Sequence, residues 1–289
     1  MLLQVLKKMK KMNNYWIDRV NKMQDRVRNK QEKEIERQIK KYFQNAMNRV
    51  IEDFENTYNA LLTKQNENKE VAIANLYKLD KYWKMQAQLK QELEKLGDKQ
   101  AKLLSKKFET TFFEVYNSLN ILGDFEFTRI DREGAIKLIN AIWCADGKDF
   151  KQRIWKNTNK LINTLNDGLV HCVITGKKTS ELKKVLINEF KVSYSEASRI
   201  VQTEMSHIQN TAARQRYEDM GVKEFQVWAK KDERRCRICG DLHQKKCPIN
   251  ELPPIPAHPR CRCTIIPVID ILFKEHLRVN KVNMYKWVR

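Results

Sequence analysis

Residues 236–263 read CRICGDLHQKKCPINELPPIPAHPRCRC, and this stretch decides how the C-terminal part of the chain folds. Its order is C-x2-C, then eighteen residues, then H-x2-C-x-C, which is close to the paired-knuckle spacing of structural zinc sites. A C-x2-C turn lets two thiolates face one ion, and the H-x2-C pair offers two more ligands at the same interval. We therefore predict a closed tetrahedral Zn²⁺ site with three thiolates and one imidazole: Cys236, Cys239, His258 and Cys261.

Cys263 competes for a place in this site, because Cys261 and Cys263 point the same way if the segment is extended. In that alternative Cys263 replaces His258, which then supports an all-thiolate site through a hydrogen bond. A different interpretation is that the cysteines are reduced and simply buried, or are paired as disulfides outside the cell. His243 and Cys247 lie inside the loop, and we do not count them as ligands because surface positions are commoner in proline-rich turns.

The sequence lacks the groups that would make such a metal catalytic. A zinc deaminase needs a glutamate two residues after a histidine or cysteine upstream of its cysteine pair, and no upstream His or Cys meets this condition. The chain also contains no H-E-x2-H and no G-x-S-x-G. Because four or five soft ligands leave no open position for water, we predict a structural ion and no enzymatic activity.

Strand-like patterns flank the cysteine cluster on both sides. Residues 222–230, VKEFQVWAK, place Phe225 and Val227 on one face, and the apolar run TIIPVI follows at 264–269. These runs predict a short β-hairpin around the cluster. Pro267 would restrict the second strand to a sheet edge.

The rest of the chain has the pattern of long helices. All six prolines lie between Pro248 and Pro267, and the first glycine is Gly97, so nothing before Gly97 has to interrupt a helix. Apolar residues recur every three to four positions over 35–62, and the period returns after the polar stretch 63–70. We predict further helices over 71–96, 101–119, 133–143, 149–174, 180–190 and 195–220.

These elements predict a mainly α fold, with a long N-terminal helical hairpin or bundle before a smaller α+β module that holds the short β-hairpin and the zinc knuckle. Asp149 and Ser195 are predicted helix N-caps, and Gly221 is a predicted residue after a helix C-terminus. The helical period is lost over 120–132, which sets the first boundary. We expect a helical arm, a helical middle region, a knuckle module and a basic tail: 1–132, 133–192, 193–270 and 271–289.

The chain is strongly basic, with 56 Lys and Arg against 36 Asp and Glu and a net charge of +20. An excess of this size attracts polyanions, nucleic acid above all. Arg234, Arg235 and Arg262 stand beside the candidate ligands and could contact phosphate or pair with nearby acids. Because the excess is spread without long runs of one sign, a solvated basic surface is the alternative.

Cysteine usage and hydropathy indicate the kind of compartment in which the protein folds. Four of the seven cysteines lie within 28 residues at metal-ligand spacing, which is not the framework of a secreted disulfide protein. The chain has no signal-peptide pattern and no run of about 18 apolar residues. We expect a soluble protein in a reducing compartment, with no membrane partner.

Three segments follow one another near the C-terminus: the helix RIVQTEMSHIQNTAARQRYEDMG (199–221), the strand and first knuckle FQVWAKKDERRCRICGDLHQK (225–245), and the closing PPIPAHPRCRCTIIPV (253–268). In this order and at this spacing they resemble the phage head morphogenesis family, the Mu F-like minor capsid proteins. The resemblance runs from about residue 193 to residue 268. The N-terminal NYWIDRVNKMQDR and KQEKEIERQIKKYF are similar to members from Gram-positive hosts. The chain departs from the family pattern at Gln202 and Gln244.

The resemblance implies a minor head protein, made with the portal and incorporated in few copies, that acts in procapsid or head assembly with portal, capsid and scaffold proteins. It implies a place in the virion after assembly in the host cytoplasm, and contact with packaged or ejected DNA. Gln202, Thr203 and Glu204 lie at the Thr-Glu position of the family, where they would contact the portal or the shell or form an exposed helix face. The alternative function is a capsid-associated nucleic-acid-processing enzyme or a toxin-like effector, because residues 71–192 have no assigned role. We expect no small-molecule substrate.

Overall fold

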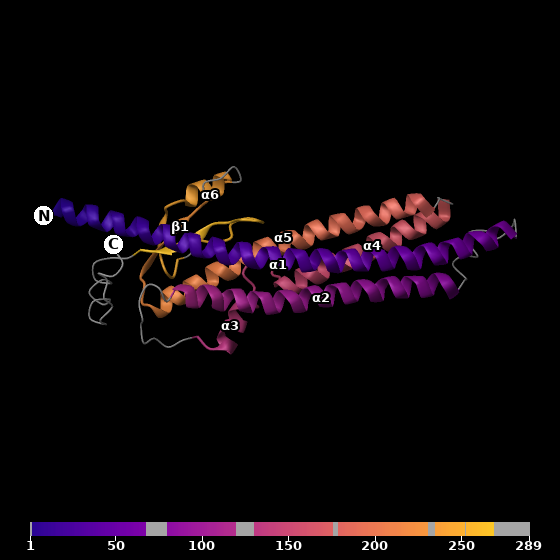
Figure 1. The fold of residues 1–289 in the computed structure, drawn as a ribbon, viewed down its shortest axis with the longest axis horizontal. Coiled ribbons are helices and arrows are strands. Elements are labelled where there is room, and N and C mark those ends of the chain that lie inside the picture. Colours follow the sequence, from indigo (N-terminus) through magenta and orange to yellow (C-terminus); the bar gives the residue numbers. More distant parts are fainter. Residues whose placement is uncertain are drawn as a thin grey trace. The chain divides into compact units, whose positions relative to one another are not determined.

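A computed structural model describes residues 2–67, 80–119, 130–175, 179–230, 235–251 and 253–268. Over these ranges the chain is mostly helical, with one small antiparallel sheet near the C-terminal end, so the predicted mainly α fold class is confirmed (Figure 1). The elements are α1 Leu2–Glu67, α2 Asp80–Ser118, α3 Arg132–Ile139, α4 Phe150–Thr175, α5 Thr179–Asp219, β1 Glu224–Trp228, α6 Arg237–Leu242, β2 Lys246–Pro248 and β3 Thr264–Pro267.

The chain divides into two compact units, each made of separate stretches of sequence. We call residues 34–105 and 142–200 the helical unit, and residues 1–33, 106–141 and 201–289 the knuckle unit. Because α1, α2 and α5 each pass through both units, neither unit corresponds to one continuous segment. The sequence-ordered domains proposed above, with boundaries after residues 132, 192 and 270, stay a prediction.

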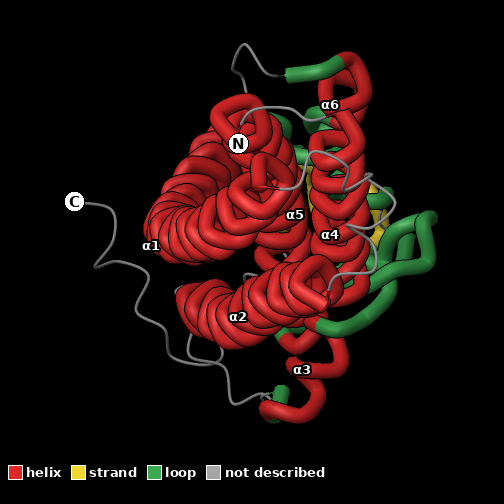
Figure 2. The backbone as a smooth tube through the Cα atoms, turned by 90° about the vertical axis from the view of Figure 1, so that its right-hand side faces the viewer, coloured by secondary structure: helices red, strands yellow, loops and turns green. Residues whose placement is uncertain are grey.

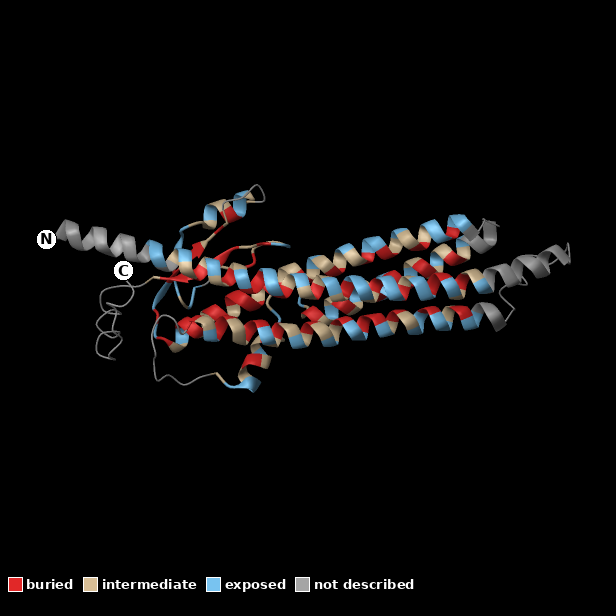
Figure 3. Ribbon diagram, viewed as in Figure 1, coloured by how far each residue is buried: buried red, intermediate tan, exposed pale blue. Residues whose placement is uncertain are grey.

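The helical unit packs parts of four helices, α1, α2, α4 and α5, around one apolar core (Figures 1 and 2). Buried residues recur along the inner side of each helix, as Figure 3 shows, and include Ile35, Ile39, Leu93, Leu165 and Leu186. The predicted stripe therefore faces the core from Ile35 to Phe54, as its helical period requires; the side chains of the rest of the stripe, 57–62, lie outside the described residues.

Two close approaches fix how the helices of this unit pack. Phe43 on α1 meets Tyr194 on α5 edge to face, with ring centroids 5.6 Å apart. At Gly97 a Cβ would lie 3.1 Å from both Trp155 Cζ3 and Thr158 Oγ1, so α2 passes close to α4 there because glycine has no side chain.

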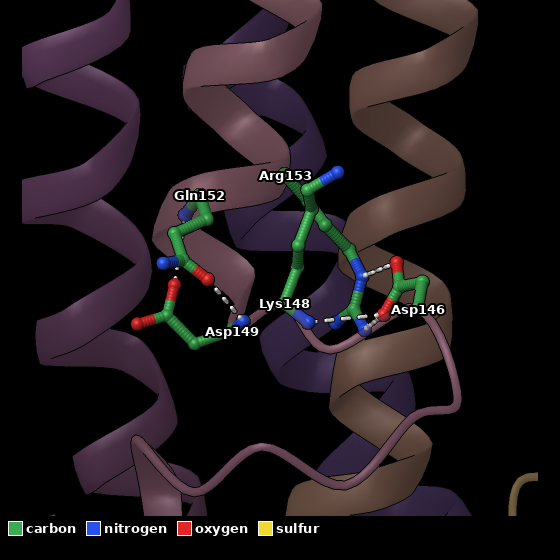
Figure 4. A network of polar contacts seen from close by, with 5 residues as sticks. All are labelled: Asp146, Lys148, Asp149, Gln152 and Arg153. Carbon is green, nitrogen blue, oxygen red and sulfur yellow. Dashed lines mark hydrogen bonds and ion pairs between the residues drawn. The ribbon is translucent and has the colours of Figure 1, made fainter.

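The start of α4 is capped by its own side chains (Figure 4). The Gln152 amide N–H donates to Asp149 Oδ1 at 2.8 Å, and the Asp149 amide N–H donates to Gln152 Oε1 at 3.0 Å. This reciprocal pair is a capping box, so the predicted Asp149 N-cap is confirmed. Arg153 forms a forked ion pair with Asp146, with N–O distances of 2.7 and 3.1 Å.

The long helices differ from the prediction at three places. Residues 179–219 form one helix, so the separate helices expected over 180–190 and 195–220 are wrong, and Ser195 is an interior residue rather than an N-cap. Phe190, Ser193 and Ala197 are buried at helical spacing, which carries the packed face through the expected break. Likewise α2 continues through Gly97, and α1 begins at Leu2 rather than near residue 35. Residues 71–79 lie outside the described residues.

The sheet of the knuckle unit begins where α5 ends. Gly221 has φ of +71°, and the amides of Gly221 and Val222 donate to the carbonyls of Glu218 and Tyr217 at 2.9 Å. This Schellman arrangement confirms the helix end predicted at Gly221 and directs the chain into β1.

The sheet order is β2-β1-β3, and both strand pairs are antiparallel. Phe225 and Val227 are fully buried, so the predicted alternation is confirmed. β3 lies at an edge, as Pro267 requires. The hairpin prediction omitted β2, a three-residue strand inside the loop. No helix in the described ranges is long and apolar enough to cross a membrane.

Candidate metal centre

The first cysteine pair sits at the start of α6. Cys236 is the N-cap of this helix, in extended conformation, and its Sγ accepts the Cys239 amide N–H at 3.4 Å. Cys239 lies in the first turn and is 5% exposed. The N-cap geometry therefore places both sulfurs on the same side of the turn, as the C-x2-C spacing predicts.

The second group of donors comes from the turn and extended segment before β3. The Cys261 amide donates to the His258 carbonyl at 3.1 Å, and Arg260 has φ of +61° within this turn. Cys261 and Cys263 are 1% and 2% exposed, so both thiols belong to the interior.

The structure brings all five predicted donors into two groups of three that share Cys239. One group is Cys236, Cys239 and His258, and the other is Cys239, Cys261 and Cys263; within each group all donor atoms lie within 4.8 Å of one another. Cys239 Sγ is 3.7 Å from Cys261 Sγ. A tetrahedral ion with sulfurs at about 2.3 Å needs sulfurs about 3.7 Å apart, so this pair already has the separation that zinc requires.

The hydrogen bonds of His258 favour it as a ligand through Nε2. Its Nδ1 lies 2.8 Å from the Pro259 carbonyl, which can only accept, so Nδ1 carries the proton. Nε2 then presents a lone pair, and it lies 3.0 Å from Cys239 Sγ. Ligating histidines commonly donate the other ring N–H to a carbonyl in this way.

The sulfurs also perturb one another's ionisation. The Cys263 thiol donates to Cys261, which lowers the pKa of Cys261 and raises the pKa of Cys263. Burial raises the pKa of Cys239. A divalent cation would take the place of the thiol protons, and the soft sulfur and imidazole donors are the set that zinc prefers. These two groups could therefore each offer three donors to a metal ion, and Cys239 belongs to both of them.

Three polar residues of α5 hold the backbone of the ligand-bearing segment. Thr203 Oγ1 accepts the Arg260 amide N–H at 3.0 Å. Asn210 donates to the Cys263 carbonyl at 2.9 Å and accepts the Ile265 amide at 3.1 Å. Tyr217 donates to the Ile265 carbonyl at 3.2 Å. Sequence reasoning missed Asn210 and Tyr217 and considered Thr203 only as a partner contact, although the seven-residue spacing of the three on one predicted helix was available as a signal.

The two loop residues that we did not count as ligands have other contacts. His243 Nδ1 accepts the Ala229 amide at 3.2 Å, and its ring packs on Trp228 with centroids 4.7 Å apart. Cys247 is buried in β2 opposite Phe225. Neither residue belongs to the two donor groups.

The predicted contact residues are placed differently from one another. Arg234 lies outside the described residues. Arg235 donates to the Gly240 carbonyl at 3.2 Å. Arg262 and Arg235 line a small cavity of about 20 Å³ beside the donors, together with two further basic residues, Lys230 and Arg260.

Gln202 and Glu204, which flank Thr203 at the Thr-Glu position on α5, are not equally accessible. Gln202 is half-buried, whereas Glu204 is 2% exposed. The Glu204 carboxylate therefore lies inside the knuckle unit, where a partner cannot reach it without rearrangement.

Comparison with known proteins agrees with this geometry. Residues 163–266 match the sequence profile described as "Phage Mu protein F like protein". The chain is also 26% identical over 170 residues to the NAD(+)--arginine ADP-ribosyltransferase EFV of Enterococcus faecalis, which covers 53% of this chain and 34% of that relative. The chain thus spans about a third of the length of this relative. No solved structure matches the chain.

The profile match includes the whole of α5, β1 and β2, all but the last residue of β3 and all five candidate metal donors, and it covers a little over a third of the chain. The resemblance seen in the sequence is therefore confirmed for residues 163–266, which are similar to the phage Mu protein F-like family.

Proposed function

We propose that this chain is a minor protein of the phage head that acts in procapsid or head assembly with the portal and with capsid or scaffold proteins. The observation that carries the proposal is the Mu F-like match over residues 163–266. The protein would be assembled in the host cytoplasm and would reside in the virion. In this role it binds partners and catalyses no reaction.

The metal would serve this role by stabilising the knuckle unit. Its sheet has three strands of only five, three and four residues. A small sheet of this kind needs added stabilisation, and a structural zinc supplies folding free energy directly. Four of Cys236, Cys239, His258, Cys261 and Cys263 would hold the ion.

Contact with packaged or ejected DNA is a finer part of the proposal. It is supported by the net charge of +20 and by the four basic residues Lys230, Arg235, Arg260 and Arg262 around one cavity. Duplex DNA binding by the full chain should weaken steeply with salt. Replacing Arg260 and Arg262 with Gln should reduce the slope by about one per lost phosphate contact. Binding that ignores salt would remove this part of the proposal.

The second candidate is a capsid-associated effector or a nucleic-acid-processing enzyme. The similarity to a protein named as an arginine ADP-ribosyltransferase favours it, although the chain spans only about a third of that relative. Incubation with labelled NAD⁺ and arginine-rich proteins tests for ADP-ribosyl transfer. Incubation with DNA and RNA over several divalent ions tests for nucleic-acid processing. Transfer of label or cleavage of nucleic acid would establish this candidate. Neither reaction is expected under the assembly proposal.

Particle composition tests the assembly proposal itself. Procapsids and mature heads, purified away from unassembled protein, should contain this chain in few copies by quantitative mass spectrometry. Particles that lack it at both stages would overturn the proposal.

A further inference from the structure

The three polar residues that hold the ligand-bearing segment lie on one face of α5. Thr203, Asn210 and Tyr217 are seven residues apart, and seven residues are close to two full helical turns. Their side chains therefore project from the same side of α5, about 10 Å apart along its axis. The segment from Arg260 to Ile265 runs along this face and is bound at each of the three levels.

Asn210 makes the most demanding of these contacts. It is 1% exposed and uses both ends of its carboxamide, donating to the Cys263 carbonyl and accepting from the Ile265 amide. A side-chain amide bound to two backbone groups in this way forms the hydrogen bonds that a neighbouring strand would form. It therefore fixes the backbone from Cys263 to Ile265. The backbone of Cys263 is thus held from α5, while its sulfur faces Cys239 and Cys261.

Thr203 acts on the other end of the segment. Its hydroxyl accepts the amide of Arg260, which has the left-handed φ of +61° that reverses the chain between His258 and Cys261. Because non-glycine residues avoid this conformation, it persists where surrounding contacts hold it. Tyr217 binds beyond the donors, at the Ile265 carbonyl inside β3.

We propose that Thr203 and Asn210 are positioning residues of the metal centre: α5 holds the backbone on both sides of Cys261 and Cys263 so that their sulfurs meet Cys239 before a metal arrives. The inference rests on the proposed metal site. It also gives Thr203, in the Thr-Glu region of the family segment, an internal role in place of a partner contact. Replacing a residue that orients a metal ligand without binding the ion itself typically changes metal affinity by 10- to 100-fold.

The test measures zinc affinity of the full-length chain by competition with a chromophoric chelator. Asn210→Asp keeps the acceptor for the Ile265 amide and removes the donor to the Cys263 carbonyl, together with a second hydrogen bond to the Ser206 carbonyl within α5. Thr203→Val removes only the hydroxyl that holds Arg260, and adds no charge. We expect both variants to bind zinc about 10- to 100-fold more weakly than the wild type. Tyr217→Phe is the matched control, because it removes an α5 contact beyond the donors and should leave zinc affinity unchanged.

A double-mutant cycle separates positioning from a general loss of stability. Asn210→Asp should couple to Cys263→Ser, because the first change acts through the second residue, and should add independently to Cys236→Ser on α6. If Asn210→Asp fails to fold by circular dichroism, Thr203→Val alone decides the question.

Three results would overturn the inference: wild-type affinity in both variants, an equal loss in Tyr217→Phe, or equal coupling of Asn210 to both cysteines. A wild-type chain that binds no zinc would overturn the metal site as well. The assembly role would then be decided by particle composition alone.

Discussion

Replacing Cys239 with Ser is the most informative single change at the metal centre, because Cys239 belongs to both donor groups. Its sulfur is 3.0 Å from His258 Nε2 and 3.7 Å from Cys261 Sγ. Structural zinc contributes about 10–16 kcal/mol in zinc-finger peptides, so one ligand of four accounts for about 2.5–4 kcal/mol. Cys239→Ser should therefore weaken zinc binding by about two to three powers of ten, whichever ligand set is used.

Cys247→Ser provides the matched control. Cys247 is buried to the same degree as Cys239, at 6% against 5% exposed, but lies in β2 outside both donor groups. Chelator competition gives the affinity, and thermal unfolding with and without zinc shows whether the ion stabilises the fold. At one limiting free zinc concentration, zinc should raise the Tm of the wild type and of Cys247→Ser clearly more than that of Cys239→Ser. Wild-type affinity in Cys239→Ser, or an equal loss in Cys247→Ser, would refute the reasoning.

Three predictions concern the helical unit. Asp149→Ala removes the N-cap of α4 and should lower the free energy of unfolding by about 1 kcal/mol in urea titrations; an unchanged midpoint would show that the capping box adds nothing. Gly97→Ala places a Cβ 3.1 Å from the Trp155 ring, so overpacking of about 1–3 kcal/mol should outweigh the helix-propensity gain of about 1 kcal/mol. A higher Tm would mean that α2 and α4 are not in tight contact there. The hydrogen bond from Lys95 holds the pKa of Glu92 below its ordinary value of 4.5. The stabilisation that the ionised Glu92 carboxylate contributes is therefore complete above pH 4.5 and is lost as the pH falls through the lowered pKa. In Glu92→Gln, the Tm should therefore fall less steeply with decreasing pH on the acid side. An acid limb as steep as in the wild type would contradict this assignment.

The features that the sequence predicted are those set by local spacing. The C-x2-C and H-x2-C-x-C pairs determine which side chains can meet, because a short turn leaves little freedom between them. The change from helical period to alternation after Gly221 likewise placed β1, since glycine supports the αL conformation that ends α5. Asp149 was recognisable as an N-cap from its position before an apolar stripe.

The features that could not be predicted from the sequence depend on contacts between distant segments. Nothing local near Ser195 distinguishes a helix start from a helix interior, and the packing of Phe190 and Ala197 decides the matter. β2 has only three residues and exists because β1 offers it an edge. Asn210 looked like any polar helix residue, since its partners at Cys263 and Ile265 lie more than fifty residues away.

Complementation of a phage that lacks this gene tests most directly the central claim, that a metal-stabilised Mu F-like segment works in head assembly. Wild type, Cys239→Ser and Cys247→Ser would be supplied in trans at equal expression, and purified heads would be assayed for this chain and for infectious titre. The account predicts that wild type and Cys247→Ser enter the heads and restore the titre, whereas Cys239→Ser does neither. Heads that contain Cys239→Ser at the wild-type level with full infectivity, or wild-type particles without this chain, would contradict it.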